Sequence, residues 1–215
     1  MDKAVIAIIL ANVLVSLKGF SDKPFLERYK FQVGPVLRGE KLRMFSSGFL
    51  HVDQAHLFFN MFALYIFADS VIDEIGVVKF LIIYVGSLLA GSTLALSFHK
   101  REPYYSAVGA SGAVMGIVYA AIMLQPDMRL SFIFFPIVSF PGYVFGVGYF
   151  LYSLYGMRTK LGNIGHSAHL GGAVGGFVLT IVLYPQVFNE NMFVVSILAL
   201  PILLMFLFKD KLENR

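Results

Sequence analysis

Seven apolar segments, most of them separated by short polar gaps, constrain this chain more than any other feature. A helix needs about 20 mostly apolar residues to cross the hydrocarbon core of a bilayer. No charged residue interrupts the centre of any segment. The sequence therefore predicts an all-α polytopic membrane protein, folded as a single membrane domain over residues 1–215. The segments are roughly 3–19, 55–71, 78–98, 110–125, 141–157, 167–184 and 192–208.

The composition supports a membrane protein and argues against other classes. Hydrophobic residues make up 58% of the chain and charged residues 14%, whereas soluble domains are about 45–50% apolar. The net charge of +4 comes from loop Lys and Arg, which would meet lipid headgroups. No stretch mixes basic and aromatic residues on a polar background, so we expect no nucleic-acid partner. The lack of cysteine excludes disulfides and thiol catalysis.

The first apolar segment has two readings. Lys3 followed by the apolar stretch 4–17 could be a signal peptide, but residues 16–20 make a poor small-residue cleavage site. This favours a first transmembrane helix. The connection that follows, about residues 20–54, carries seven basic residues when Lys18 is included, yet it also contains apolar pieces such as Met44-Phe45. We therefore expect it to fold back and lie partly in the membrane interface.

Two further loops carry information. Leu130 to Phe140 is apolar, but Pro136 and Pro141 favour an irregular loop before the fifth span. The loops also differ in charge. A cytoplasmic N-terminus would leave three basic residues on that face and the other fourteen on the opposite face. The positive-inside rule favours the reverse orientation, unless a folded first loop overrides the count.

Polar clusters occupy the N-terminal ends of the second, fourth and sixth spans. Ionisable and amide groups in apolar spans are costly and are functional-site candidates by default. Because even-numbered spans cross the membrane in the same direction, these three ends lie at one face and at similar depth. Counting spans therefore predicts a shallow polar pocket. Its candidate groups are His51, His56 and Asn60 in the first cluster, Ser111 in the second, and His166 and His169 in the third.

Small residues follow the candidate hydroxyl and imidazole. Gly112 and Gly116 are four apart, as are Gly172 and Gly176, and this spacing lets two membrane helices approach closely. Close approach is what a hydrogen bond of about 2.6–3.2 Å between Ser and His on two helices requires. Taken alone, these glycines could equally serve packing only.

His56 and Asn60 suit an oxyanion hole. They lie four residues apart and so share a helix face, and both can donate to charge that develops in a transition state. The Ser111 N–H, at a helix start, is a further donor. A structural role remains the alternative for His56, where the ring would cap loop carbonyls. That alternative is stronger for His51 and His166, which lie just outside the spans.

In this order, the residues resemble the rhomboid family of intramembrane serine proteases, over about residues 40–180. The resemblance implies a six-helix core, about residues 40–184, plus an extra C-terminal transmembrane helix, about 192–208. No single motif is very specific, but the ordered set is. The matching features are residues 109–112, residues 168–172, the series His51, His56 and Asn60, and Arg43 of the family's first-loop motif.

The resemblance also implies roles. Ser111 and His169 would form a catalytic dyad with no third acidic member. His56, Asn60, Gly109 and the Ser111 amide would support the oxyanion, His51 would hold pocket water, and Arg43 would anchor the first loop. Two departures concern packing. Leu42 stands where a tryptophan usually precedes the arginine, and Met115 stands where an aromatic often packs under the catalytic histidine.

These implications amount to an intramembrane serine endopeptidase that cleaves transmembrane segments through an acyl-enzyme. We expect no cofactor and no metal, since no H-E-x-x-H type ligand set is present. The expected partners are transmembrane protein substrates and the lipid bilayer, and the expected location is the cell membrane. The main alternative is a catalytically silent relative that binds membrane proteins. A small transporter would instead carry polar groups near mid-membrane.

Overall fold

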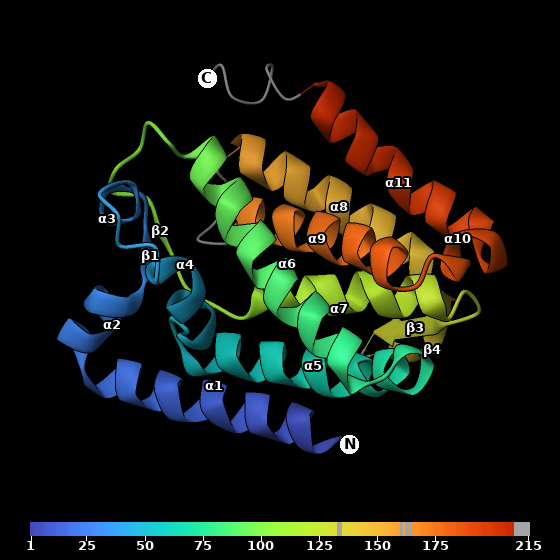
Figure 1. Ribbon diagram of the computed structural model, residues 1–215, viewed down its shortest axis with the longest axis horizontal. Helices are drawn as coiled ribbons and strands as arrows, with labels where there is room; N and C mark the ends of the chain where they lie inside the picture. Colours follow the sequence, from blue (N-terminus) through green and yellow to red (C-terminus); the bar gives the residue numbers. More distant parts are fainter. Residues whose placement is uncertain (133–134, 160, 162–164, 209–215) are drawn as a thin grey trace.

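Long helices dominate the computed structural model, which describes residues 1–132, 135–159, 161 and 165–208 (Figure 1). Over these ranges a long helix covers each of the seven apolar segments, so the all-α prediction is confirmed. The helix ends lie within a few residues of the predicted ones. The seven are α1 (Lys3–Ser21), α5 (Gln54–Ile75), α6 (Val77–Phe98), α7 (Ser111–Leu124), α8 (Gly142–Thr159), α9 (His166–Leu183) and α11 (Met192–Leu207).

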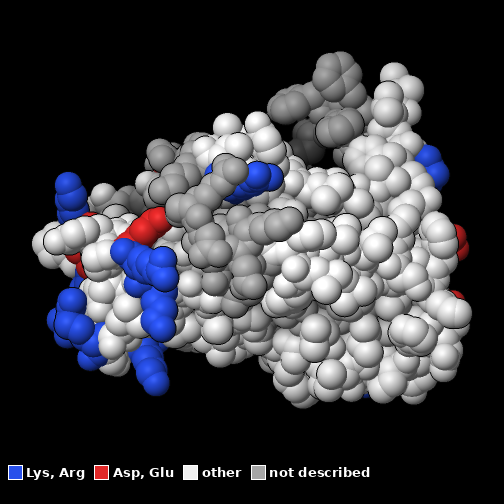
Figure 2. Space-filling model, turned by 90° about the horizontal axis from the view of Figure 1, so that it is seen from above, with Lys and Arg blue, Asp and Glu red and all other residues white. Residues whose placement is uncertain are grey.

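The chain is an integral, multi-pass membrane protein. Among the described residues, α1, α5, α6 and α9 are each long and apolar enough to cross a membrane, and α7 and α11 are shorter apolar helices. Lys and Arg gather at the end of the molecule that carries the first loop, while the surface visible beside it is almost uncharged (Figure 2). Large apolar side chains such as Leu14 and Phe58 are exposed, as expected where lipid is the solvent.

Short side-chain caps set where the helices begin. Asp2 accepts from the Ala4 N–H at 2.7 Å at the start of α1. Asp53 accepts from the His56 N–H at 2.7 Å at the start of α5. These bonds satisfy amides that have no acceptor within the helix. The second cap fixes the beginning of the span that carries His56 and Asn60.

The first loop is folded, as expected. It contains α2 (Lys23–Tyr29), β1 (Phe31–Gln32), α3 (Val33–Leu37), α4 (Arg43–Ser46) and the 3₁₀ turn η1 (Ser47–Phe49). Strand β1 pairs antiparallel with β2 (Ser106–Ala107), with Phe31 opposite Ala107. The pairing ties the first loop to the segment that leads into α7.

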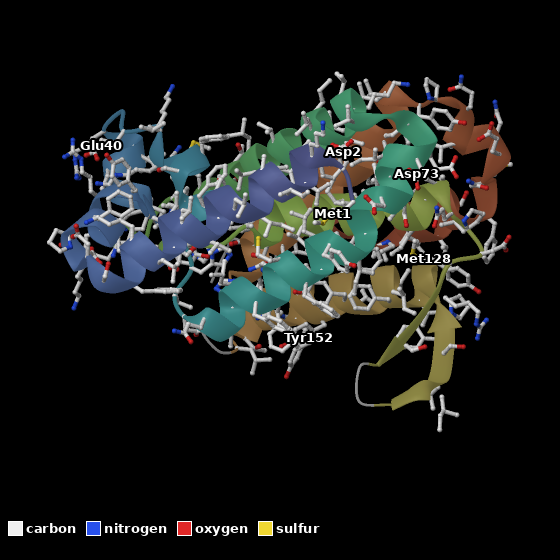
Figure 3. All side chains as sticks on the ribbon, turned by 90° about the horizontal axis from the view of Figure 1, so that it is seen from below. Met1, Asp2, Glu40, Asp73, Met128 and Tyr152 are labelled. Carbon is white, nitrogen blue, oxygen red and sulfur yellow. The ribbon has the colours of Figure 1, made fainter. Side chains whose placement is uncertain are left out.

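The prediction of an irregular loop before the fifth span is wrong. Residues there form an antiparallel hairpin of β3 (Arg129–Phe132) and β4 (Phe135–Pro141), with Arg129 opposite Pro141. It projects from the bundle near Met128 (Figure 3). Both strands of a two-stranded ribbon are edge strands, and an edge tolerates proline because not every N–H is needed for pairing.

The core lies where α6, α7 and α9 meet. Helix α7 is buried along its length from Gly112 to Leu124, as a helix apolar on all sides should be. Its 14 residues give a length of only ~21 Å, less than the ~30 Å of a hydrocarbon core. If α7 lies across the membrane, at least one of its two ends is therefore below the membrane surface. The short α10 (Gln186–Glu190) leads into α11, which packs against α8.

Candidate active site

Ser111 is the first residue of α7, and a constrained segment leads to it. Gly109 has a φ of +133°, a conformation that L side chains rarely adopt. Its N–H donates to the Ser47 carbonyl of η1 at 3.0 Å. The helical hydrogen bonds of α7 begin with Val114, whose N–H donates to the Ala110 carbonyl at 2.9 Å. The Ser111 amide thus belongs to the first turn, whose amides lack a helical acceptor.

His169 lies in the first turn of α9, and its ring meets Ser111. His169 Nε2 is 2.6 Å from Ser111 Oγ, although the two residues are 58 positions apart in the chain. His169 is 7% exposed. A hydrogen bond of this length lets the imidazole receive the hydroxyl proton.

Glycines bring α7 and α9 close enough for this bond. A Cβ on Gly172 would overlap the carbonyl oxygen of Gly112, and a Cβ on Gly176 would overlap that of Gly116. The two pairs at four-residue spacing therefore face each other, backbone against backbone. This contact fixes the distance between the helix starts that carry Ser111 and His169.

His56 and Gly109 lie beside the serine. A Cβ on Gly109 would be 2.7 Å from His56 Cε1, 2.9 Å from His56 Nε2 and 3.6 Å from Ser111 Oγ. The imidazole thus packs directly on the glycine backbone at the serine. Asn60 is buried one turn further along α5, and its Nδ2 donates to the His56 carbonyl at 3.1 Å. The second N–H of this amide is available to another acceptor.

His51 is fully buried and does not line the cavity at the serine. The Ala110 N–H donates to His51 Nε2 at 3.4 Å, so Nδ1 carries the ring proton. Nδ1 is 2.8 Å from Ser16 Oγ, and the Ser16 hydroxyl donates to Phe49 O at 3.0 Å. Burial and the nearby His56 lower the pKa of His51 to about 3, which agrees with a neutral ring. His51 therefore links α1 to the residue that precedes Ser111.

A cavity of about 980 Å³ contains the site. Its walls come from the first loop, from the segment before α7 and from α5, α6, α7, α8 and α9, and Met115 lines it one turn after Ser111. The walls include Ser111, His169, His56, Asn60 and Gly109, so the structure brings the predicted dyad and oxyanion residues to one space. His166 is buried next to the site, and its Nε2 is 3.1 Å from Leu161 O.

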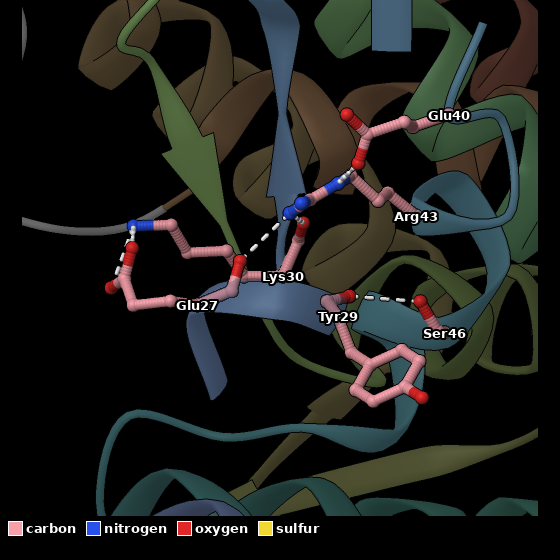
Figure 4. A network of polar contacts seen from close by, with 6 residues as sticks. All are labelled: Glu27, Tyr29, Lys30, Glu40, Arg43 and Ser46. Carbon is pink, nitrogen blue, oxygen red and sulfur yellow. Dashed lines mark hydrogen bonds and ion pairs between the residues drawn. The ribbon is translucent and has the colours of Figure 1, made fainter. Parts of the chain in front are cut away.

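Arg43 joins three parts of the first loop (Figure 4). Its Nη1 donates to the carbonyls of Glu27 at 2.8 Å and Lys30 at 3.1 Å, at the end of α2. Its Nε donates to Glu40 at 2.7 Å. The Ser46 hydroxyl adds a bond to Tyr29 O at 2.8 Å. Arg43 thus lies where an anchor of this loop would have to lie, although Leu42 beside it is exposed.

Tyr149 of α8 joins the site without having been predicted. Its hydroxyl is 2.8 Å from His169 Nδ1, and it lines the cavity. The sequence did not single it out, since the same span also carries Tyr143, Tyr152 and Tyr155. Its partner could not be read from the spacing of residues. In the part of the chain that the structure describes, no group of three His, Asp or Glu side chains could hold a metal ion.

Comparisons with known proteins agree on one family. The sequence model of the Rhomboid domain matches residues 38–186. The chain is 30% identical over 188 residues to RHOMBOID-like protein 12, mitochondrial, from Arabidopsis thaliana, which covers 79% of this chain and 55% of the relative. It is 30% identical over 157 residues to Rhomboid protein 1, mitochondrial, from Saccharomyces cerevisiae. These residues cover 71% of this chain and 44% of the relative.

A bacterial relative completes the comparison. Rhomboid protease GluP from Bacillus subtilis is 31% identical over 150 residues, which cover 69% of this chain and 27% of the relative. The chain spans about half the length of the two mitochondrial relatives. The similarity thus extends over most of this chain, whereas the relatives contain further sequence.

Proposed function

We propose, from the premise that this chain belongs to the rhomboid family, that it is an intramembrane serine endopeptidase. Its substrates would be the transmembrane segments of other membrane proteins. One observation carries the proposal. Ser111 Oγ and His169 Nε2 share a 2.6 Å hydrogen bond inside a cavity of a membrane protein. A relative from Bacillus subtilis is named a rhomboid protease, which supports the same activity.

The proposed reaction uses the two residues as nucleophile and base. His169 Nε2 accepts the Ser111 proton as Oγ bonds to the carbonyl carbon of the substrate peptide. The C–N bond then breaks, and the imidazolium gives its proton to the leaving amine. Water, deprotonated by His169, hydrolyses the acyl-enzyme and restores the serine. The cycle needs no cofactor.

Oxyanion stabilisation would come from groups around the serine. The His56 ring packs on Gly109 next to Ser111, and the Asn60 amide has an N–H to spare. With the first-turn amide of Ser111, these donors can face the carbonyl oxygen as it gains charge. Gly109 contributes by leaving space for the imidazole.

The substrate must present an unwound segment. Peptide bonds in a membrane-spanning helix are engaged in their own hydrogen bonds, so the hydroxyl cannot reach their carbonyl carbons. We infer a preference for segments with small or helix-breaking residues near one membrane face. Helix α7, at 14 residues, is short enough for Ser111 to start below the surface, and such a depth would suit cleavage near that face.

Purified protein in detergent tests the proposal. Wild type should cleave a single-pass substrate, and Ser111→Ala and His169→Ala should each abolish cleavage. Ser167→Ala is the matched control, because Ser167 is a buried serine in the first turn of α9 whose partner is Tyr105 at 3.3 Å. Cleavage that persists in Ser111→Ala would end the proposal.

The second candidate is a silent family member that binds membrane proteins without cutting them. A fluorophosphonate probe separates the two, because it labels an activated serine even when the natural substrate is unknown. Labelling of wild type and its loss in Ser111→Ala would support the protease. The binding protein would be supported if the probe did not label wild type, and if wild type bound a single-pass protein stably without cleaving it.

The proposal also covers the extent of the membrane domain and the cellular location of the protein. We propose that α11 belongs to the same membrane domain as the six long helices before it, since it packs against α8.

We also propose the cell membrane as the location. Several relatives are named mitochondrial, from plants, fungi and animals, so fractionation of tagged protein is the deciding measurement. Recovery in mitochondrial membranes would replace this part of the proposal.

A further inference from the structure

We propose that Tyr149 is a positioning residue that sets which nitrogen of His169 carries the proton. The site would then be a chain of three hydrogen-bonded side chains, Ser111, His169 and Tyr149. The kinetic test of this inference rests on the proposed protease function, whereas its spectroscopic test does not.

The His169 ring is held from both of its nitrogens. Nε2 is 2.6 Å from Ser111 Oγ on α7, and Nδ1 is 2.8 Å from Tyr149 Oη on α8. The Tyr149 and His169 ring centroids are 5.9 Å apart, at 32°. Two further imidazoles, His166 and His56, lie near. Among the described residues, no carboxylate is a hydrogen-bond partner of this ring.

The role of Tyr149 follows from where the single proton of a neutral His169 ring must lie. A neutral imidazole has one N–H, and only the other nitrogen can accept a proton. For Nε2 to act as base toward Ser111, the proton must be on Nδ1. Nδ1–H then donates to the Tyr149 oxygen, which fixes both the tautomer and the ring orientation. In the well-known triads a carboxylate performs this function for the base. Here a neutral hydroxyl takes its place.

The Tyr149 hydroxyl can donate its own hydrogen bond to a group other than His169. Ser153 lies one turn further along α8, is buried, and has no hydrogen-bond partner within the described ranges. Its oxygen is therefore free to accept from Tyr149. If Tyr149 donated to Nδ1 instead, Nε2 would hold the proton and His169 could not accept the Ser111 hydrogen. The arrangement that serves catalysis is thus the one in which the phenol oxygen accepts.

Helix α8 is the element on which this arrangement depends. Ser111 and His169 belong to α7 and α9, which are locked together by glycine contacts. Tyr149 belongs to a third helix that packs against α9 and α11. Displacement of α8 from α9 would break the Tyr149 bond and leave the Ser111–His169 pair in place. The dyad is therefore correctly protonated when α8 is packed.

The kinetic test compares two phenols on the same helix. Tyr149→Phe keeps the ring and removes the hydroxyl, and it should lower kcat by about tenfold with KM unchanged, the effect of losing one ordinary hydrogen bond. Tyr152→Phe is the matched control, because Tyr152 touches Tyr149 and His166 through its ring. It should match wild type. Equal rates for all three proteins would overturn the inference and leave the proposed protease standing.

The spectroscopic test needs no substrate. The chain has five histidines, so ¹⁵N-histidine NMR in micelles can be assigned by loss of the His169 signals in His169→Gln. Wild type at neutral pH should show His169 protonated at Nδ1, and Tyr149→Phe should show a mixture of tautomers. Protonation at Nε2 in wild type, or an unchanged tautomer in Tyr149→Phe, would overturn the inference. Failure of wild type to cleave any substrate would instead count against the protease.

Discussion

The backbone of Gly172 in α9 lies against the carbonyl oxygen of Gly112 in α7, with no room between them for a methyl group. Gly172→Ala must therefore push the helices apart or strain both, and overpacking of this kind costs about 1–3 kcal/mol. We expect a lower thermal midpoint and a loss of cleavage, because the Ser111–His169 distance depends on this contact.

Gly148→Ala is the control for this change. Gly148 lies within α8, and among the described residues no atom outside the adjoining stretch of its own helix lies within 4 Å of the position that its Cβ would take. Alanine also suits a helix interior better than glycine, by roughly 0.5–1 kcal/mol. Gly148→Ala should therefore keep or raise the midpoint. Equal midpoints for the two variants would contradict the close-contact explanation.

His51 should make stability depend on pH. Burial lowers the pKa of His51 to about 3 in the folded protein, while the unfolded chain has a pKa near the ordinary ~6.5. Between these values the unfolded state binds a proton that the folded state does not. The free energy of unfolding should thus fall as pH drops from about 6.5 toward 3, by up to ~1.4 kcal/mol per unit from this ring.

The measurement is unfolding in detergent at several pH values, for wild type and His51→Asn. The variant loses bonds to Ser16 and Ala110 and should be less stable at pH 7. Its stability should also change less with pH, since one titrating ring is gone. A slope as steep as that of wild type would show that His51 does not carry this dependence.

Asn60 and Asn12 offer a matched pair of variants with which to test the proposed oxyanion hole. Each is a buried asparagine in a membrane helix, and each donates from Nδ2 to the carbonyl four residues earlier, at 3.1 Å and 2.9 Å. Only Asn60 lines the cavity. Loss of an oxyanion donor typically lowers kcat by about 10²–10³. Asn60→Ala should show this decrease, whereas Asn12→Ala should affect stability alone. Similar kcat values in both variants would contradict the proposed role of Asn60 as an oxyanion donor.

Arg43→Lys should loosen the first loop. A lysine cannot bond Glu27 O, Lys30 O and Glu40 at once, because it lacks the fork geometry of a guanidinium. The loss of two bonds from a cationic donor should lower stability by about 1–3 kcal/mol, with Glu40 contributing little because it is half exposed. Limited proteolysis of residues 22–50 measures the effect. Arg38→Lys, an exposed change in the same loop, should show no difference from wild type.

The helices and the meeting of Ser111 with His169 could be predicted from the sequence for a simple reason. Spans are set by apolar length, and even-numbered spans must run in the same direction. The glycine spacing then indicates which faces of α7 and α9 meet. These inferences depend on local composition and on counting, and both are visible in a linear chain.

The remaining features depend on contacts between distant segments. Pro136 and Pro141 favoured an irregular loop, but pairing with residues near Arg129 made a hairpin. Likewise, the bond of Tyr149 to His169 and the link of His51 to Ser16 depend on how α8 and α1 pack, and no spacing rule encodes this. His51 was expected to hold cavity water, and its burial away from the cavity wall follows from the same packing.

The cavity wall has one further consequence. Near the first loop it includes Glu27 and Lys30, whose side chains are 2.7 Å apart, and further in it includes Ser111. Charged groups of this kind retain hydration, so solvent can follow the protein wall from the membrane surface down to the serine. The proposed hydrolysis consumes one water molecule per bond cut, and that water would come from the aqueous phase, because the lipid around the bundle has none to supply.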